Sequence, residues 1–276
     1  MNNKNVKWKS NLIYKEGTPR MTVIAGIKFD MGIVIASDSQ ATIGGILKRV
    51  DERKISEIEE FQNFRFNFAG AGDERLIGRA KEQLIIECQN REINSVFDFK
   101  NVCEDVVRFI KQRYTEDGEY PNLEFLTGIA TKKDFGLLRL YPDGVASNVN
   151  YYDVIGSGML FAEYIYSRLD KENLSAIEAV NTVLYVVEEI KEIDPNCGGP
   201  ATMSVLFSNG NFFRYKDYDK VLNARAKILQ TTDDQMKPFW QKMIRDPFKI
   251  PVLDNSGVSE ENKKVNNDGK KQENNK

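Results

Sequence analysis

A regular pattern of apolar positions begins at residue 22. Residues 22–30 and 32–38 are short runs rich in Val and Ile, with a glycine-containing turn at 30–32. Two such runs around a turn are typical of a β-hairpin. Shorter apolar and aromatic runs predict further strands at 54–58 and 64–69.

The spacing of apolar residues then changes to three and four, which is the period of an amphipathic helix. This spacing predicts helices at 73–91, 98–115, 160–169 and 175–193. Between and after them, strand patterns return at 123–131, 135–141, 145–155, 202–207 and 212–215. The order is strands, two helices, strands, two helices and strands. Because every element must bury one face, and strict βαβ alternation is absent, we predict an α+β fold: a four-layer αββα sandwich.

The pattern also divides the chain into segments. Residues 1–21 have no sustained period and are interpreted as a leader, similar to a propeptide. The sandwich domain is predicted over 22–217, followed by a helical extension over 218–251 that includes a helix at 219–243. Residues 252–276 consist mainly of Asn, Lys, Glu, Gly and Asp, and we expect this polar tail to be disordered.

The composition limits the possible chemistry, because the sequence contains no histidine. Ser-His-Asp and Cys-His catalysis need an imidazole base, and an HExxH zinc site needs two imidazole ligands. These mechanisms are excluded. A hydrolase with this composition must use a lysine, a carboxylate, a tyrosine or a backbone amine as its base.

Charge and cysteine content exclude several classes of partner. The net charge of −2 provides no general attraction for nucleic acid or an anionic membrane, and no apolar run is long enough to span a bilayer. Three cysteines without metal-ligand spacing fit a reducing cytoplasm. The glycine-rich loop at 70–75, which resembles a dinucleotide loop, has Arg75 at its third glycine position and acidic Asp73 and Glu74 beside it. We therefore expect neither a cofactor nor a metal.

Two segments near the start of the pattern carry a family resemblance. Thr22-Val-Ile-Ala-Gly, followed by Asp38-Ser-Gln-Ala-Thr, resembles the opening of proteasome β-subunits. In that family a threonine begins the mature chain. Asp38 lies 38 − 22 = 16 residues after Thr22, and Lys54 lies 54 − 22 = 32 residues after it, both as in the family.

Later motifs extend the resemblance to about residue 215. Ser157, in Gly-Ser-Gly, falls where the family has an accessory serine, and Asp194 follows it by 194 − 157 = 37 residues, again as in the family. Cys197 stands where the family has a second serine. Gly70 matches the glycine whose backbone amide forms the oxyanion hole.

The resemblance implies a threonine-type endopeptidase of the N-terminal nucleophile class. Thr22 would supply both the attacking hydroxyl and, through its own α-amine, the base. Lys54 would activate the hydroxyl as a cation paired with Asp38, while Ser157 and Asp194 orient the amine. By alignment, the main specificity pocket would be lined by Ala41, Glu52, Ser56, Phe68 and Gly72.

The resemblance also implies partners. These are a peptide or unfolded protein as substrate and a homo-oligomeric ring, with or without α-type subunits, in the cytoplasm. Three residues depart from the family. Met21 replaces the glycine of self-processing members, Gln40 replaces an arginine, and Cys197 offers a weaker hydrogen-bonding group than serine. Two alternatives remain: a catalytically silent structural β-type subunit that keeps its leader, and a related amidohydrolase that acts on a small amide.

Overall fold

A computed structural model describes residues 22–43, 47–49, 54–116, 118–169 and 172–213. All of them lie in one compact unit of the chain. The predicted leader, the helical extension and the polar tail lie outside the described residues, as does Glu52.

The first sheet is built around the predicted N-terminal hairpin. It is antiparallel and has the strand order β10-β1-β2-β11-β12. The strands are β1 (Val23–Phe29), β2 (Gly32–Ser37), β10 (Tyr152–Gly156), β11 (Thr202–Phe207) and β12 (Phe212–Phe213). The start of β1 lies beside the end of β10, because Val23 pairs with Gly156.

The second sheet is also antiparallel and has the order β5-β6-β7-β8-β9. Its strands are β5 (Glu59–Glu60), β6 (Phe64–Gly72), β7 (Leu123–Thr131), β8 (Phe135–Leu140) and β9 (Ala146–Val149). A separate hairpin consists of β3 (Ala41–Ile43) and β4 (Leu47–Arg49).

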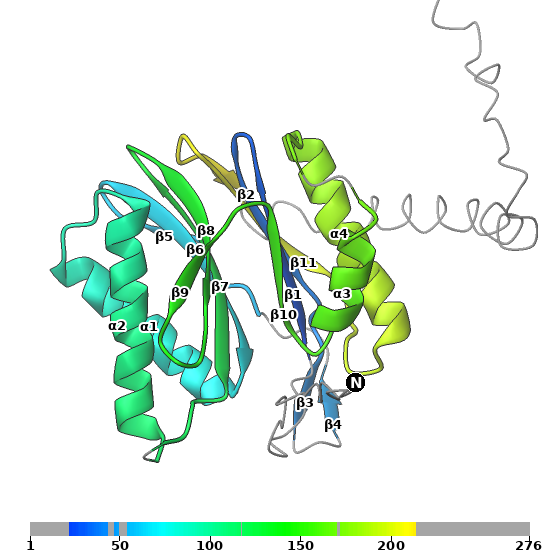
Figure 1. The fold of residues 1–276 in the computed structure, drawn as a ribbon, viewed down its shortest axis with the longest axis horizontal. Coiled ribbons are helices and arrows are strands. Elements are labelled where there is room, and N and C mark those ends of the chain that lie inside the picture. The colour runs from blue at the N-terminus through cyan, green and yellow to red at the C-terminus, as the bar shows by residue number, and fades with distance from the viewer. Residues whose placement is uncertain (1–21, 44–46, 50–53, 117, 170–171, 214–276) are drawn as a thin grey trace, which may run out of the picture. The chain divides into compact units, whose positions relative to one another are not determined.

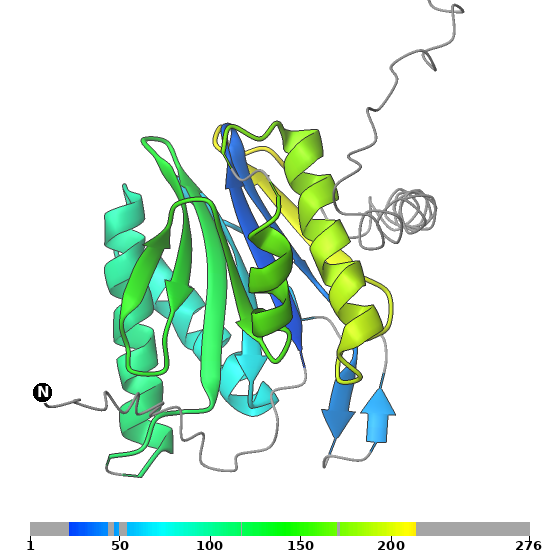
Figure 2. The same cartoon turned by 45° about the vertical axis from the view of Figure 1, so that its right-hand side comes forward.

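Two pairs of helices cover the outer faces of the sheets, as Figures 1 and 2 show. The helices are α1 (Glu74–Asn90), α2 (Val96–Tyr114), α3 (Met159–Tyr166) and α4 (Ala176–Ile193). Local sequence explains where α1 and α4 begin. The Asp73 carboxylate accepts hydrogen bonds from two backbone amides at the start of α1, and Ser175 and Glu178 form a reciprocal capping box at the start of α4.

Three apolar clusters lie between the four layers. One joins α3 and α4 to the first sheet, one joins α1 and α2 to the second sheet, and a smaller one fills the space between the sheets. Alternation along each strand produces this arrangement: on β1, Val23 and Ala25 face the helices, whereas Ile24 faces the other sheet. The predicted αββα sandwich is therefore confirmed.

The observed strands differ from the predicted ones in three respects. The stretch 145–155 is not one strand, because β9 ends at Val149 in the second sheet and β10 begins at Tyr152 in the first. The predicted strand at 54–58 is reduced to an isolated bridge between Ile55 and Ala69. The hairpin β3–β4 and the short strand β5 lie outside all the predicted strands.

A buried polar contact fixes the two sheets against each other. The Asn67 side chain on β6 donates from Nδ2 to Ser204 Oγ on β11 (3.0 Å) and accepts the Gly128 backbone N–H at Oδ1 (2.8 Å). Asn67 is fully buried, so loss of its amide leaves partners that cannot reach water.

We predict that Asn67→Ala lowers the free energy of unfolding by about 2–3 kcal/mol, because it leaves a buried amide N–H unpaired and a cavity behind. Urea denaturation measures the change. The matched control is Asn148→Ala, at an exposed position on β9, which should change stability by less than about 0.5 kcal/mol. Equal effects of the two substitutions would contradict the role given to Asn67.

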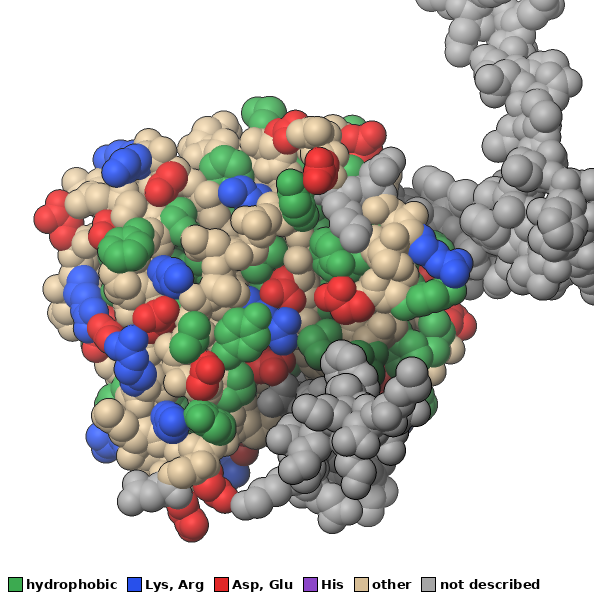
Figure 3. All heavy atoms as spheres, in the orientation of Figure 1, with side chains coloured by type: hydrophobic (Ala, Val, Ile, Leu, Met, Phe, Trp, Pro, Cys, Tyr) green, Lys and Arg blue, Asp and Glu red, His purple; other side chains and the backbone are tan. Residues whose placement is uncertain are grey.

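Charges of both signs are interspersed on the molecular face in Figure 3, which shows no continuous field of one sign. Among the described residues, no helix combines the length and apolar character needed to cross a bilayer. In the same ranges, Cys, Asp and Glu side chains form no group of three that could hold a metal ion.

Candidate active site

Asp38 is the centre of the site. It follows the last residue of β2 and is fully buried. Its Oδ1 accepts hydrogen bonds from Lys54 Nζ (2.6 Å) and from the Val23 backbone N–H (3.0 Å). Its Oδ2 accepts the backbone N–H groups of Gln40 (3.2 Å) and Gly198 (3.1 Å). One cation and three amides therefore hold the carboxylate in place.

Lys54 is nearly as buried as its partner, with 7% of its side chain exposed. It precedes the bridge between Ile55 and Ala69, which attaches its segment to β6. Because a buried charge is costly unless it is paired, the ion pair fixes the position of the Lys54 ammonium group. The spacing of 16 residues between Asp38 and Lys54 thus corresponds to a direct contact.

Ser157 and Asp194 form the second half of the site. Ser157 Oγ lies 2.8 Å from Asp194 Oδ2, 3.3 Å from the Thr22 backbone N and 3.4 Å from the Thr22 carbonyl oxygen. A hydroxyl has one proton, and the shorter contact is to Asp194. Ser157 therefore donates to Asp194 and accepts from the Thr22 nitrogen.

The glycines beside Ser157 allow this close approach. Gly156 has a φ of +96°, and a Cβ there would collide with the Thr22 carbonyl. The N-cap of α3 is Gly158 and not Ser157, so Ser157 is not a helix cap. Its hydroxyl is used by Thr22 and Asp194 instead.

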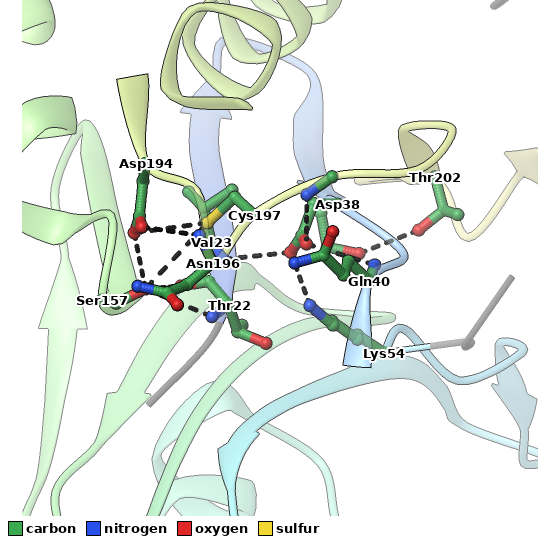
Figure 4. A network of polar contacts seen from close by, with 12 residues as sticks. Thr22, Val23, Asp38, Gln40, Lys54, Ser157, Asp194, Asn196, Cys197 and Thr202 are labelled. Atoms are coloured by element: carbon green, nitrogen blue, oxygen red, sulfur yellow. Dashed lines mark hydrogen bonds and ion pairs between the residues drawn. The ribbon is translucent and has the colours of Figure 1, made fainter. Parts of the chain in front are cut away.

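Thr22 lies between the two halves, as Figure 4 shows, with Ser157 and Asp194 on one side and Lys54 on the other. It immediately precedes β1 and is 8% exposed. Val23, the next residue, shares Asp38 Oδ1 with Lys54. The backbone of Thr22 and Val23 is therefore linked to both carboxylates of the site: to Asp38 directly through the Val23 N–H, and to Asp194 through Ser157.

Cys197 is a buried, protonated thiol. Its Sγ lies 3.6 Å from Asp194 Oδ2 and 4.0 Å from Ser157 Oγ. Burial raises the pKa of the Cys197 thiol well above its ordinary value, and the neighbouring charges of Asp38 and Asp194 add to this effect. The thiolate, which is the reactive form of cysteine, is therefore disfavoured at neutral pH.

Gly70 lies near the end of β6. Its backbone N–H points to the Lys54 carbonyl at 3.4 Å, a long hydrogen bond that a substrate oxygen would have to share or replace. A Cβ at Gly70 would approach Ile77 Cγ2 to 2.7 Å. Nothing in the sequence indicates that Gly70 lies against Ile77, a residue of α1.

The residues predicted to line the specificity pocket are placed as follows. Two hydrogen bonds join Ser56 and Phe68. The Ser56 backbone N–H donates to the Phe68 carbonyl (2.8 Å), and the Phe68 backbone N–H donates to Ser56 Oγ (3.2 Å). The Phe68 ring is buried against Phe125, with ring centroids 4.4 Å apart. Ala41 is half-buried at the start of β3.

Gly72 has a clear backbone requirement. Its φ is +128°, and a Cβ would collide with the Asn122 carbonyl. This conformation explains the glycine without a role in a pocket. The pocket remains a prediction, since Glu52 lies outside the described residues.

A family model described as "Proteasome subunit" matches residues 20–206, which is more than half of the chain. The chain belongs to the proteasome subunit family. The proteasome subunit beta of Nanoarchaeum equitans (strain Kin4-M) is 30% identical over 144 residues, covering 51% of this chain and 70% of that protein. The predicted kinship with β-type N-terminal nucleophile hydrolases is therefore confirmed.

Solved structures of Anbu proteins have the same fold. A (Gly-1) mutant of Anbu from Hyphomicrobium sp. strain MC1 superposes with a TM-score of 0.67 at 15% identity, covering 80% of this chain and 99% of that one. Anbu from Yersinia bercovieri, described as an ancestral beta-subunit, gives 0.63 at 15% identity, covering 85% and 100%. Anbu from Pseudomonas aeruginosa, described in a helical assembly, gives 0.66 at 15% identity, covering 86% and 100%.

Proposed function

We propose that this proteasome-family chain is a threonine-type endopeptidase whose nucleophile is Thr22, freed at its amine by removal of residues 1–21. One observation carries the proposal: Asp38 Oδ1 is shared by the buried Lys54 ammonium group and by the N–H of Val23, the residue next to Thr22. This arrangement holds a cation beside the first residue of β1. A cation in this position meets the need of a threonine hydroxyl for a group that stabilises its alkoxide.

The contacts support specific roles in the reaction. The free Thr22 α-amine takes the hydroxyl proton as Oγ attacks the carbonyl carbon of the substrate, and the neighbouring Lys54 charge stabilises the developing alkoxide. The collapse of the tetrahedral intermediate breaks the C–N bond, and the amine passes its proton to the leaving group. Water then hydrolyses the resulting ester in the same way. Ser157 and Asp194 orient the amine through the hydrogen bond now made by the Thr22 nitrogen.

The Gly70 amide is assigned to the oxyanion because its N–H points to the backbone carbonyl of Lys54, the residue that supplies the cation of the site. The proposed substrate is a peptide or an unfolded protein. We further propose that the active form is a homo-oligomer, since the matching family model is described as a proteasome subunit and Anbu from Pseudomonas aeruginosa is described as a complex in a helical assembly.

A structural, inactive subunit is the second candidate function. Met21 and a retained leader favour it, because a Thr22 nitrogen in a peptide bond cannot accept a proton. An amidohydrolase acting on small amides would use the same site. Two observations distinguish these candidates: the residue at which the active chain begins, and the class of substrate that it cleaves.

We predict that cleavage of a fluorogenic peptide panel occurs only with chains that begin at Thr22. The α-amine must be neutral to act as a base, so kcat/KM should fall on the acid side of a group titrating at or below about 8. Intact-mass measurement and N-terminal sequencing of the active preparation give the chain start. Full activity in a chain that still begins at Met1 would refute the mechanism, whereas a mature chain inactive on all peptides would favour one of the other candidates.

A further inference from the structure

The carbonyl oxygen of Pro195 accepts two side-chain donors from residues more than 140 positions away. Gln40 Nε2 lies 3.3 Å from it and Lys48 Nζ lies 2.6 Å from it. Gln40 is 6% exposed, whereas the Lys48 contact is at the surface. The buried amide therefore makes the better protected of the two contacts.

Pro195 directly follows Asp194, whose two oxygens are both engaged. Oδ2 accepts from Ser157 Oγ at 2.8 Å, and Oδ1 accepts the Asn196 backbone N–H at 2.9 Å. The orientation of the Asp194 carboxylate therefore depends on the conformation of the turn that begins at Pro195. A side chain that donates a hydrogen bond to the Pro195 carbonyl therefore restrains the conformation of this turn.

Gln40 also contacts the other half of the site. Its backbone N–H donates to Asp38 Oδ2, which in turn accepts the Gly198 N–H. Gln40 Oε1 packs so closely on Gly198 that a Cβ there would lie 2.6 Å from it. Ser39 N, one residue earlier, donates to the Gly198 carbonyl at 3.1 Å.

From these contacts we infer that Gln40 is a positioning residue, which joins the Asp38–Lys54 half of the site to the turn that orients Asp194 and Ser157. This inference rests on the proposed peptidase function, because it assigns Gln40 a part in the same reaction. The hydrogen bonds of Gln40 go to Asp38 and Pro195 and not to Thr22. Gln40 acts through the Pro195 carbonyl and the Gly198 backbone.

The test is Gln40→Met, which keeps the length of the side chain and removes the amide that donates to Pro195. We expect kcat to fall about tenfold with KM within twofold, because a misplaced Asp194 affects the attack on the substrate more than its binding. The matched control is Gln83→Met on α1, which removes the hydrogen bond from Gln83 Nε2 to Glu87 Oε1 (3.0 Å) in the helical layer outside the second sheet. Its kcat should stay within twofold of the original.

A second measurement does not depend on peptidase activity. In chains with Thr22→Ala, hydrogen exchange followed by mass spectrometry reports on the amides of Asn196 and Gly198, which bond to Asp194 and Asp38. Gln40→Met should speed their exchange about tenfold, while exchange in α4 stays unchanged. If the unmodified chain cleaves nothing, the proposed function fails but this measurement still decides whether Gln40 orders the turn.

Unchanged exchange and unchanged kcat in Gln40→Met would overturn the inference. Lys48→Met offers a further discrimination, since the exposed Lys48 contact should contribute less than twofold to kcat. A larger loss from Lys48→Met than from Gln40→Met would assign the positioning role to the hairpin β3–β4 and overturn it for Gln40.

Discussion

Substitution of Thr22 by Ala, in a chain prepared to begin at residue 22, is expected to lower kcat/KM for peptides by at least about 10⁴-fold, as loss of a nucleophile does in other hydrolases. The fold should remain, because the contacts of Thr22 with Ser157 use its backbone nitrogen and carbonyl. The free energy of unfolding should change by less than about 1 kcal/mol. A fluorogenic peptide assay and urea denaturation measure the two effects.

Thr22→Ser is the matched control, since it keeps both the hydroxyl and the α-amine. It should retain activity within about tenfold of the original, the methyl group serving only to restrict the rotamer. Cleavage by Thr22→Ala at a rate near that of Thr22→Ser would refute the assignment of the nucleophile. In the full-length chain, Thr22→Ala also distinguishes two routes of maturation: self-cleavage at Met21 requires the hydroxyl, whereas translation from Met21 with removal of the methionine does not.

Substitution of Lys54 by Met is expected to have two separable effects. Catalysis should fall about 10³-fold, because the cation that stabilises the Thr22 alkoxide is lost. Stability should fall by about 3 kcal/mol, because Asp38 is left as a buried carboxylate without its cation. The three backbone N–H groups that remain on Asp38 keep this loss at the lower end of the range for broken buried pairs.

The control for the stability effect is Arg139→Met. It breaks another largely buried ion pair, in which Arg139 Nη1 lies 2.7 Å from Asp153 Oδ1 and the two side chains are 11% and 16% exposed. It should cost a similar amount of stability and leave kcat/KM within about fivefold when assayed well below the midpoint of unfolding. If both variants lose activity equally, the loss in Lys54→Met reflects stability and not chemistry.

Local sequence was sufficient for the helices whose ends carry their own capping groups. Asp73 before α1, and Ser175 with Glu178 at α4, bond to amides within three residues, so no distant contact is needed to define these ends. Strands are harder to predict from local sequence, because a strand is stabilised only by pairing with another strand. The run 145–155 has the composition of one strand but contributes to two sheets, and the period of its side chains cannot show this change.

The sequence by itself determined the family, the absence of an imidazole base and the spacings that relate Thr22 to Asp38 and Lys54. These features are a matter of residue type and distance along the chain. Only the tertiary structure decided which atoms meet: that Lys54 and the Val23 amide share one oxygen of Asp38, and that Ser157 lies between Thr22 and Asp194. In the sequence, Gln40 is only a departure from the family pattern. Its contact with Pro195 joins residues 155 positions apart, and such a contact follows from the packing of strands and loops rather than from any local preference.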